Sequence, residues 1–259
     1  MTDIRWVREG RLARLRLQRP ARHNAISAAM WRALPELCRE IDADPEVAAV
    51  IVEGEGGQAF SAGADIAEFG TVFADAGSTA AYNAAVRAGL AAVEGLDRPS
   101  IALVRGLCVG GGCGLALACD LRFAGATARL GITPARLGLA YGFDDTRRLV
   151  ATVGPSRAKD MLFSGRLLDA AEALAIGLVD RVLPDGEVEA AALDYANGLA
   201  ERAPLSLRAA KRMVEAVMAG ADSDTRETAA LYDAAYRSAD FREGQAAFAE
   251  RRPPRFRGS

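Results

Sequence analysis

The chain has 259 residues, 51% hydrophobic and 25% charged, which is typical of a globular protein and enough to bury a large core. Its formal net charge of −2 excludes a nucleic-acid binder that relies on a strong global basic field. No stretch of about 18 residues is continuously apolar, and the N-terminus lacks an apolar signal core. We therefore predict a cytoplasmic protein that binds neither nucleic acid nor membrane.

The N-terminal quarter predicts a strand, a helix and a second strand. Residues 11–19 place leucines among arginines and, with Val7 nearby, indicate a half-exposed strand or hairpin. Asn24 and Ser27 are candidate helix starts, because both side chains can cap a helix. Residues 47–54, VAAVIVEG, predict a short buried parallel strand.

Strands and helices alternate through the middle of the chain. Residues 54–69 indicate a loop that leads into a short helix, and a longer helix is expected around residues 79–96. Residues 98–106, RPSIALVRG, repeat the buried-strand pattern, and three consecutive glycines then open an apolar helix. Residues 119–132 predict two further short strands.

The C-terminal half is mainly helical. Helical patterns over residues 144–199 are interrupted by a strand and a turn at residues 178–187. From about Pro204 the periodicity is helical again, up to a basic tail. We therefore predict an α/β core over residues 1–200 and a C-terminal helical segment over residues 201–259.

Common nucleotide and hydrolase motifs are incomplete. Neither glycine-rich stretch continues into the Gly-Lys-Ser/Thr of a Walker loop. Residues 54–59 fit the dinucleotide fingerprint with Asp75 about twenty residues further on, but Gly63 falls where the phosphate-binding helix should continue. The only histidine, His23, lies in a turn, and no G-x-S-x-G elbow is present. We interpret His23 as a surface or cap residue.

Metal and disulfide sites are not predicted. The four cysteines lie in apolar surroundings without zinc spacing and are expected to be buried, reduced thiols: Cys38, Cys108, Cys113 and Cys119. With a single histidine, carboxylates would have to supply nearly all ligands of a catalytic metal.

Two glycine-containing loops each follow an apolar strand: FSAGADI at residues 60–66 and GLCVGGGCG at residues 106–114. Backbone N–H groups converging from two such loops would form an oxyanion hole, and the helix after Gly112 would add the positive end of its dipole. The anion would be one that develops during reaction, such as a thioester enolate. The alternative is that both loops are merely tight turns. Gly114 stands inside the helix, where glycine costs about 1 kcal/mol relative to alanine.

Five segments occur in this order: RPARHNAIS, FSAGADIAEF, VRGLCVGGGCGLALACDLRFA, GRLLDAAEALAIGLVDRV and FREGQAAFAERR. Together they strongly resemble the crotonase superfamily, the enoyl-CoA hydratase/isomerase family, from residue 5 to residue 256. The resemblance implies an α/β fold built as a spiral of β-β-α turns with a C-terminal helical extension, assembled as a homotrimer or a dimer of trimers. It also implies a coenzyme A thioester as substrate and no separate cofactor.

The resemblance assigns roles to particular residues. The backbone N–H groups of Ala64 and Gly111 correspond to the oxyanion hole of the family. The CoA-binding positions correspond to Ala62, Asp65 and Ile66 along the adenine and pantetheine, Arg22 near the phosphates, and Phe248, which could close the site from a neighbouring subunit.

The catalytic carboxylates of the family are not kept. The two glutamates of family hydratases correspond here to Gly114 and Pro134, and the aspartate of some family isomerases and dehalogenases corresponds to Gly142. Three nearby side chains could replace them: Tyr141, Asp144 and Asp145. Alternatively, Tyr141 packs at the pocket rim and one of the aspartates caps the following helix.

Four functions stay open at this point. Asp144 or Asp145 could move one proton in an enoyl-CoA isomerase. Decarboxylation of a malonyl-type thioester needs no base, and residues 133–141 locally resemble the TPA-LG--Y pattern of family methylmalonyl-CoA decarboxylases. Hydration would need non-standard acid and base groups. A non-catalytic acyl-CoA-binding protein would also fit the missing glutamates.

Overall fold

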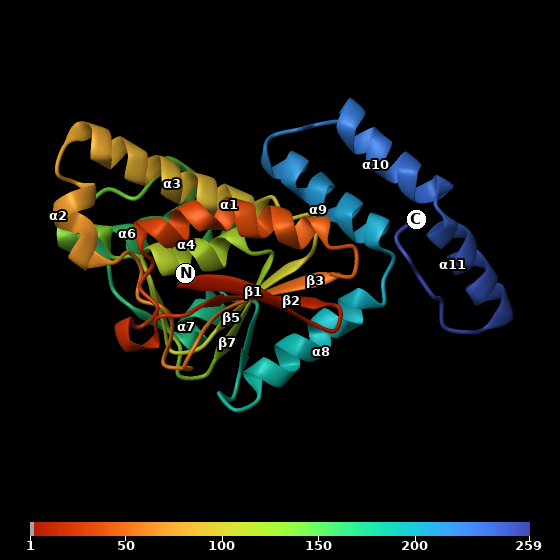
Figure 1. The fold of residues 1–259 in the computed structure, drawn as a ribbon, viewed down its shortest axis with the longest axis horizontal. Coiled ribbons are helices and arrows are strands. Elements are labelled where there is room, and N and C mark those ends of the chain that lie inside the picture. The colour runs from red at the N-terminus through yellow and green to blue at the C-terminus, as the bar shows by residue number, and fades with distance from the viewer. Residues whose placement is uncertain (1–2) are drawn as a thin grey trace.

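The structure, a computed structural model that describes residues 3–259, contains two sheets surrounded by helices (Figure 1). The six-stranded sheet has the order β1-β2-β3-β5-β7-β10, with strands β1 Ile4–Glu9, β2 Leu12–Leu17, β3 Ala49–Gly54, β5 Ser100–Val104, β7 Leu121–Gly125 and β10 Arg181–Leu183. The four-stranded sheet has the order β4-β6-β8-β9, with strands β4 Ala59–Ser61, β6 Leu107–Val109, β8 Arg129–Gly131 and β9 Leu168–Asp169. Neighbouring strands run parallel except in the pairs β1–β2 and β8–β9.

The chain passes repeatedly from the large sheet to the small one. The pairs β3–β4, β5–β6 and β7–β8 each contribute one strand to either sheet before a helical segment follows. The helices of these turns are α2 Phe69–Val72, α3 Ala76–Glu94, α4 Gly111–Ala118, α5 Phe143–Val153 and α6 Pro155–Ser164. This repeated strand–strand–helix path confirms the predicted α/β spiral.

Helices cover both faces of the large sheet (Figure 1). On one face α1, Ala28–Ala43, packs against α3, and the main core forms beneath them around Trp31, Leu34 and Leu90. On the other face α8, Val188–Ala200, closes a smaller apolar cluster. The short helix α7, Ala170–Ala175, instead buries Ala170 and Ala173 in the main core. Helix α1 begins after Ser27, whose Oγ accepts a hydrogen bond from the Met30 N–H at 3.3 Å, as predicted.

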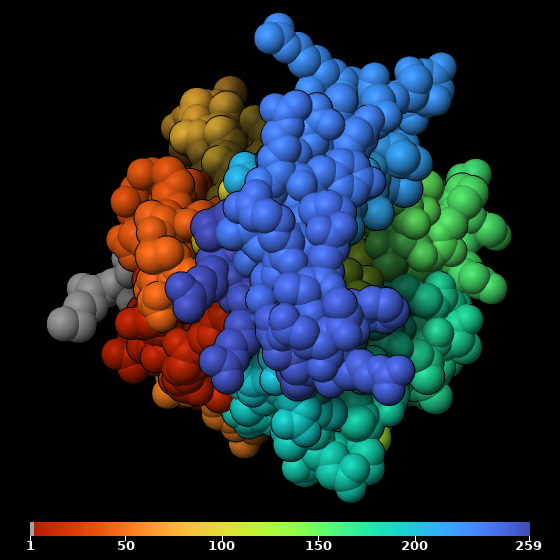
Figure 2. Space-filling view, turned by 90° about the vertical axis from the view of Figure 1, so that its right-hand side faces the viewer, coloured from red at the N-terminus to blue at the C-terminus, as the bar shows by residue number. Residues whose placement is uncertain are grey.

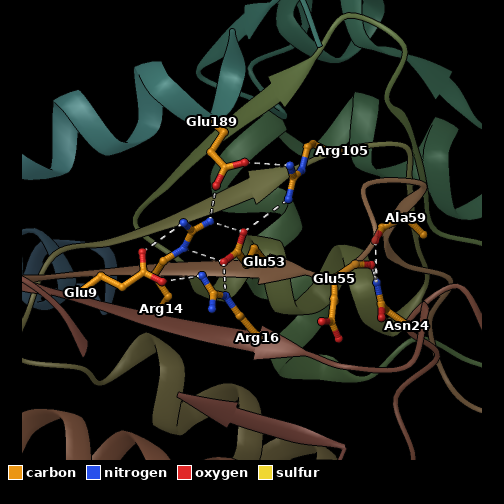
Figure 3. A network of polar contacts seen from close by, with 9 residues as sticks. All are labelled: Glu9, Arg14, Arg16, Asn24, Glu53, Glu55, Ala59, Arg105 and Glu189. Carbon is orange, nitrogen blue, oxygen red and sulfur yellow. Dashed lines mark hydrogen bonds and ion pairs between the residues drawn. The ribbon is translucent and has the colours of Figure 1, made fainter. Parts of the chain in front are cut away.

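The hairpin expected near residues 11–19 is confirmed as β1–β2, but the expectation that it is half exposed is wrong for β2. Every residue of β2 except the half-buried Arg16 is buried. Arg14 can be buried because its guanidinium meets Glu53 of β3 at 2.7 and 2.6 Å, and Arg16 meets the same carboxylate at 2.9 Å (Figure 3). The ion pairs allow an arginine-rich sequence to occupy a central strand.

The C-terminal segment consists of α9 Pro204–Met218, α10 Arg226–Arg237 and α11 Ala239–Glu250. Helix α9 is tied to the core by ion pairs from Lys211 to Asp120 at 3.0 Å and from Arg212 to Asp97 at 2.9 Å. Helices α10 and α11 extend away from the sheets in Figure 1 and lie in front of the core in Figure 2. Within residues 3–259, none of the helices is both long and apolar enough to cross a membrane.

Candidate active site

Two neighbouring parallel strands bring the two glycine-containing loops together. Strand β4 pairs with β6, so the residues after Ser61 and after Val109 leave the same edge of the small sheet. A Cβ placed on Gly63 would lie 3.4 Å from the Gly111 nitrogen, and one on Gly111 would lie 3.7 Å from the Ala64 nitrogen. Within residues 3–259, neither the Ala64 N–H nor the Gly111 N–H donates a hydrogen bond to a protein acceptor. Two free donors therefore lie close together at the start of α4.

The glycines are required by the close approach of these loops. Gly63 has φ +97°, and a Cβ there would lie 2.7 Å from the Val109 carbonyl oxygen. A Cβ on Gly112 would lie 2.6 Å from the Ser61 carbonyl oxygen. Any larger residue would separate the loops, since real Cβ atoms do not approach backbone so closely.

The segment before α1 fixes the first loop from outside. The Ile26 N–H donates to the Gly63 carbonyl at 2.7 Å, and the Asp65 N–H donates to the Ile26 carbonyl at 3.1 Å. These two bonds flank Ala64, so the Ala64 N–H is directed away from the segment that carries Ile26. Asn24, the other candidate helix start, instead adopts φ +54° and its amide donates to the Ala59 carbonyl at 2.8 Å.

Three other CoA-binding candidates lie next to Asp65: Ala62 and Ile66 in the same loop, and Arg22 in the turn before α1. Burial raises the pKa of the Asp65 carboxyl, but hydrogen bonds from Arg19 and the Ala67 N–H, together with the charges of Arg19 and Arg22, outweigh burial and leave the pKa below its usual range. Arg19 and Arg22 lie 2.8 and 3.2 Å from the carboxylate. Ala62 is half-buried, whereas Ile66 is 61% exposed and Arg22 points largely to solvent. Asp65 thus orders the loop, and the exposed residues are free to contact a ligand.

Tyr141 and Asp145 meet at Gly114, one helical turn beyond Gly111. A Cβ on Gly114 would lie 3.1 Å from Tyr141 Oη and 3.9 Å from Asp145 Oδ1. A Cβ on Gly142 would lie 3.0 Å from Asp145 Oδ2. The Asp145 carboxylate therefore lies between two of the positions at which the family resemblance places carboxylates in other members.

The two groups at Gly114 differ in protonation. Burial is the main cause that raises the pKa of Asp145, and Asp144 and Glu94 raise it further, while Arg148 lowers it. Tyr141 Oη is buried and has no hydrogen-bond partner within residues 3–259, and burial keeps its pKa well above the usual range. Tyr141 thus remains a neutral donor, and Asp145 is a carboxylate whose proton affinity is increased.

The structure separates Asp144 from Asp145 and corrects one prediction about both. Helix α5 begins at Phe143 after Gly142, so neither aspartate caps it; both lie in its first turn. Asp144 lines a surface hollow with Arg87 and Arg147, and it is not among the nearest atoms to the Cβ position of Gly114. Only Asp145 faces the candidate site.

Other sequence predictions have direct outcomes. Asp75 caps α3 by accepting from the Ser78 N–H at 2.8 Å, which replaces the dinucleotide interpretation with a structural role. His23 is exposed and ends a short 3-10 helix, Pro20–Arg22, as predicted. The four cysteines are buried and free, as expected, and burial raises the pKa of Cys38 and Cys119 to about 12. Within residues 3–259, no group of three potential metal ligands gathers.

Phe248 does not reach the site of its own chain. It lies on α11 with 89% of its surface exposed, at the opposite end of the molecule from α2 (Figure 1). Sequence reasoning also missed Trp31, whose Cζ2 would lie 3.2 Å from a Cβ on Gly111. Its position on the apolar face of α1 gave no signal beyond core packing, because only the fold brings that face to Gly111.

Comparison with known proteins identifies the family. The model of the enoyl-CoA hydratase/isomerase family matches residues 8–259. The chain is 34% identical to the short-chain-enoyl-CoA hydratase of Clostridium acetobutylicum, over 97% of this chain and 96% of the relative. It is also 34% identical to the human mitochondrial methylglutaconyl-CoA hydratase, over 91% of this chain and 70% of the relative. A crystal structure of an enoyl-CoA hydratase/isomerase family protein from Hyphomonas neptunium superimposes with a TM-score of 0.95 at 42% identity, covering 98% of this chain and 97% of the other. The chain belongs to the enoyl-CoA hydratase/isomerase family.

Proposed function

We propose that this protein is an acyl-CoA enzyme of the isomerase type, which moves a double bond of an enoyl-CoA by one position. The observation that carries the proposal is the Asp145 carboxylate, 3.9 Å from the Cβ position of Gly114 and 3.0 Å from that of Gly142. One base in this place suits a reaction that removes and returns a single proton. CoA enters as part of the substrate, and no separate cofactor is proposed.

One base is enough for this reaction, because the proton that it removes is the proton that it returns. The Asp145 carboxylate removes a proton from C2 of a 3-enoyl thioester, and the C–H electron pair moves into the carbonyl to form a dienolate. The N–H groups of Ala64 and Gly111 donate to the resulting oxyanion, with the N-terminus of α4 behind them. Protonated Asp145 then returns the proton to C4, and the double bond lies between C2 and C3. Tyr141, which stays protonated, supplies a donor beside the acyl group and does not act as a base.

The other reactions fit the site less well. A malonyl-type substrate would bring its own carboxylate toward Asp145, and two carboxylates at close range repel each other. Hydration is favoured by the names of the relatives, but the positions of Gly114 and Pro134 carry no group that could hold a water. A non-catalytic acyl-CoA binder would have no use for a buried carboxylate whose ionisation burial opposes.

We also propose a homotrimer, or a dimer of trimers, in the cytoplasm. The exposure of Phe248, which in its own chain lies far from the site, supports a contribution from a neighbouring subunit. Four free buried thiols fit a reducing compartment.

The test is turnover of defined thioesters by purified protein. Wild type is expected to convert 3-enoyl-CoA to 2-enoyl-CoA, and Asp145→Asn is expected to lower kcat by roughly 10²–10⁴ with little change in KM. Asp144→Asn is the matched control and should keep turnover. Full activity of Asp145→Asn, or efficient hydration of 2-enoyl-CoA without isomerisation, would overturn the proposal.

The same variant separates catalysis from stability. Because burial raises the pKa of Asp145, its stabilising contribution is fully present below the unfolded pKa and is lost as pH rises through the folded pKa. At pH values above the folded pKa, Asp145→Asn is therefore expected to melt no lower than wild type, although it loses activity. A large drop in melting temperature would assign Asp145 a structural role.

A further inference from the structure

Asp145 is the inner end of a chain of ion pairs that reaches from Gly114 to the surface. Arg148, one turn further along α5, places Nη1 3.2 Å from Asp145 Oδ1. Glu94 of α3 receives Nε and Nη2 of the same guanidinium at 3.0 and 2.6 Å. The Arg148 side chain is only 5% exposed, whereas the Glu94 side chain is 31% exposed and forms the surface end of the chain of ion pairs.

We infer that Arg148 is a positioning residue for Asp145 and that Glu94 holds Arg148 in place, so that the pair fixes the carboxylate against Gly114. This inference rests on the proposed function of Asp145 as the base. Arg148 and Glu94 lie on two different helices, outside the family motifs of this sequence.

The geometry explains how the pair would act. Two of the three guanidinium nitrogens of Arg148 are occupied by Glu94, which leaves Nη1 directed at Asp145. The planar guanidinium cannot rotate to satisfy another partner without losing both bonds to Glu94. Asp145 Oδ1 is thereby held, and Oδ2 faces the Cβ position of Gly142, free to accept and return a proton. Arg148 orients the base without contacting substrate.

The charges around Asp145 oppose one another. The charged groups that act on it are Asp144 and Arg148 on α5 and Glu94 on α3, with the Tyr141 hydroxyl beside it at Gly114 and Arg147 beyond Glu94. Arg148 favours the ionised carboxylate, whereas Glu94 and Asp144 disfavour it. Removing Arg148 should therefore increase the proton affinity of Asp145, and neutralising Glu94 should decrease it.

The experiment compares the direction in which each substitution shifts the pKa of Asp145. In Arg148→Met, the acid limb of the pH profile of kcat/KM is expected to move to higher pH by about one unit, with lower kcat. In Glu94→Gln, the limb should move to lower pH, again with lower kcat because Arg148 is released. Arg148→Lys keeps the charge and should restore the position of the limb better than it restores kcat, since an ammonium cannot hold both carboxylates in one plane.

Arg147→Gln is the matched control. Arg147 donates to Glu94 at 3.0 Å from the solvent side and does not contact Asp145, so the acid limb should stay in place. Shifts of the same direction in Arg148→Met and Glu94→Gln, or lower kcat without any shift in either, would reduce the pair to a structural role. If Arg148→Met does not fold, the direction in which the acid limb moves in Glu94→Gln tests the inference alone.

A readout without catalysis keeps this inference distinct from the proposed function. Carbon-13 at the aspartate carboxyl groups, with the Asp145 signal assigned by its loss in Asp145→Asn, gives the pKa of Asp145 by titration. Opposite pKa shifts in the two variants support the pair even if no isomerase activity is found. Unchanged titration in both variants would reject it even in an active isomerase.

Discussion

At the scale of single residues, Gly114 and Tyr141 depend on each other. A methyl group on Gly114 would lie 3.1 Å from Tyr141 Oη, which is tighter than an ordinary contact. Tyr141 Oη has no hydrogen-bond partner within residues 3–259, and an unpaired buried hydroxyl costs about 1–3 kcal/mol. The hydroxyl that glycine admits is thus held at the site at the expense of stability.

A double-mutant cycle measures this dependence. Tyr141→Phe is expected to raise the melting temperature, because it removes the unpaired hydroxyl. Gly114→Ala should gain nothing on its own, since Tyr141 has to move, but should stabilise the Tyr141→Phe background by about 1 kcal/mol through helix propensity. Urea denaturation of the four proteins tests the cycle. An equal effect of Gly114→Ala in both backgrounds would show that the two residues are independent.

The sequence predicts which residues gather near the site better than it predicts how they point. Tyr141 and Asp145 come within reach of Gly114, in keeping with their nomination as candidates. The capping interpretation of the two aspartates is wrong because α5 begins at Phe143, and one residue of offset turns a cap into a side chain of the first turn. Side chains at neighbouring helix positions differ by about 100° in direction, so one aspartate faces the site and the other does not.

At the scale of elements, long apolar runs are predictable and very short strands are not. Strand β3 and helix α4 follow from hydrophobic runs and glycine punctuation. Strands β4 and β6 have three residues each, too few for a period-two pattern, yet their pairing is what brings the two loops together. The convergence of the loops is therefore a tertiary property that the sequence could only suggest.

The ion pair between Arg14 of β2 and Glu53 of β3 is buried, so breaking it should destabilise the protein. The Glu53 side chain is 3% exposed and neutralises Arg14, which is 8% exposed and also meets Glu9 and Glu189 (Figure 3). Glu53→Gln is expected to cost about 3 kcal/mol of unfolding free energy, because it leaves the buried Arg14 and the half-buried Arg16 without their shared carboxylate. Asp160→Asn, which breaks an exposed pair with Arg166, should cost less than about 1 kcal/mol in the same urea titration. Equal costs would show that burial does not set the value of these pairs.

At the scale of the whole molecule, helix α9 joins the C-terminal helices to the core. Helix α9 carries the ion pairs to the core, whereas α10 packs on α9 and α11 packs on α10. The helices themselves follow from periodicity, but their direction does not, because it depends on tertiary contacts such as the ion pairs of α9 with the core. The outcome is an arm that leaves Tyr236 62% and Phe248 89% exposed. Exposed aromatic side chains of this kind mark surfaces for association.

Association through this arm has a direct test. Light scattering of the wild-type protein is expected to give three or six times the 27.2 kDa of one chain. Phe248→Asp should raise KM for CoA thioesters and favour smaller species on dilution, since a charge would replace the apolar contact that we propose with the neighbouring subunit. Its secondary structure should be unchanged, because Phe248 is hardly covered by its own chain. Leu174→Asp, which adds the same charge at an exposed apolar position on α7, is the control and should leave both mass and KM as they are. The opposite outcome is a wild type that is a monomer and a Phe248→Asp variant that turns over CoA thioesters equally well. Each chain would then complete its site alone.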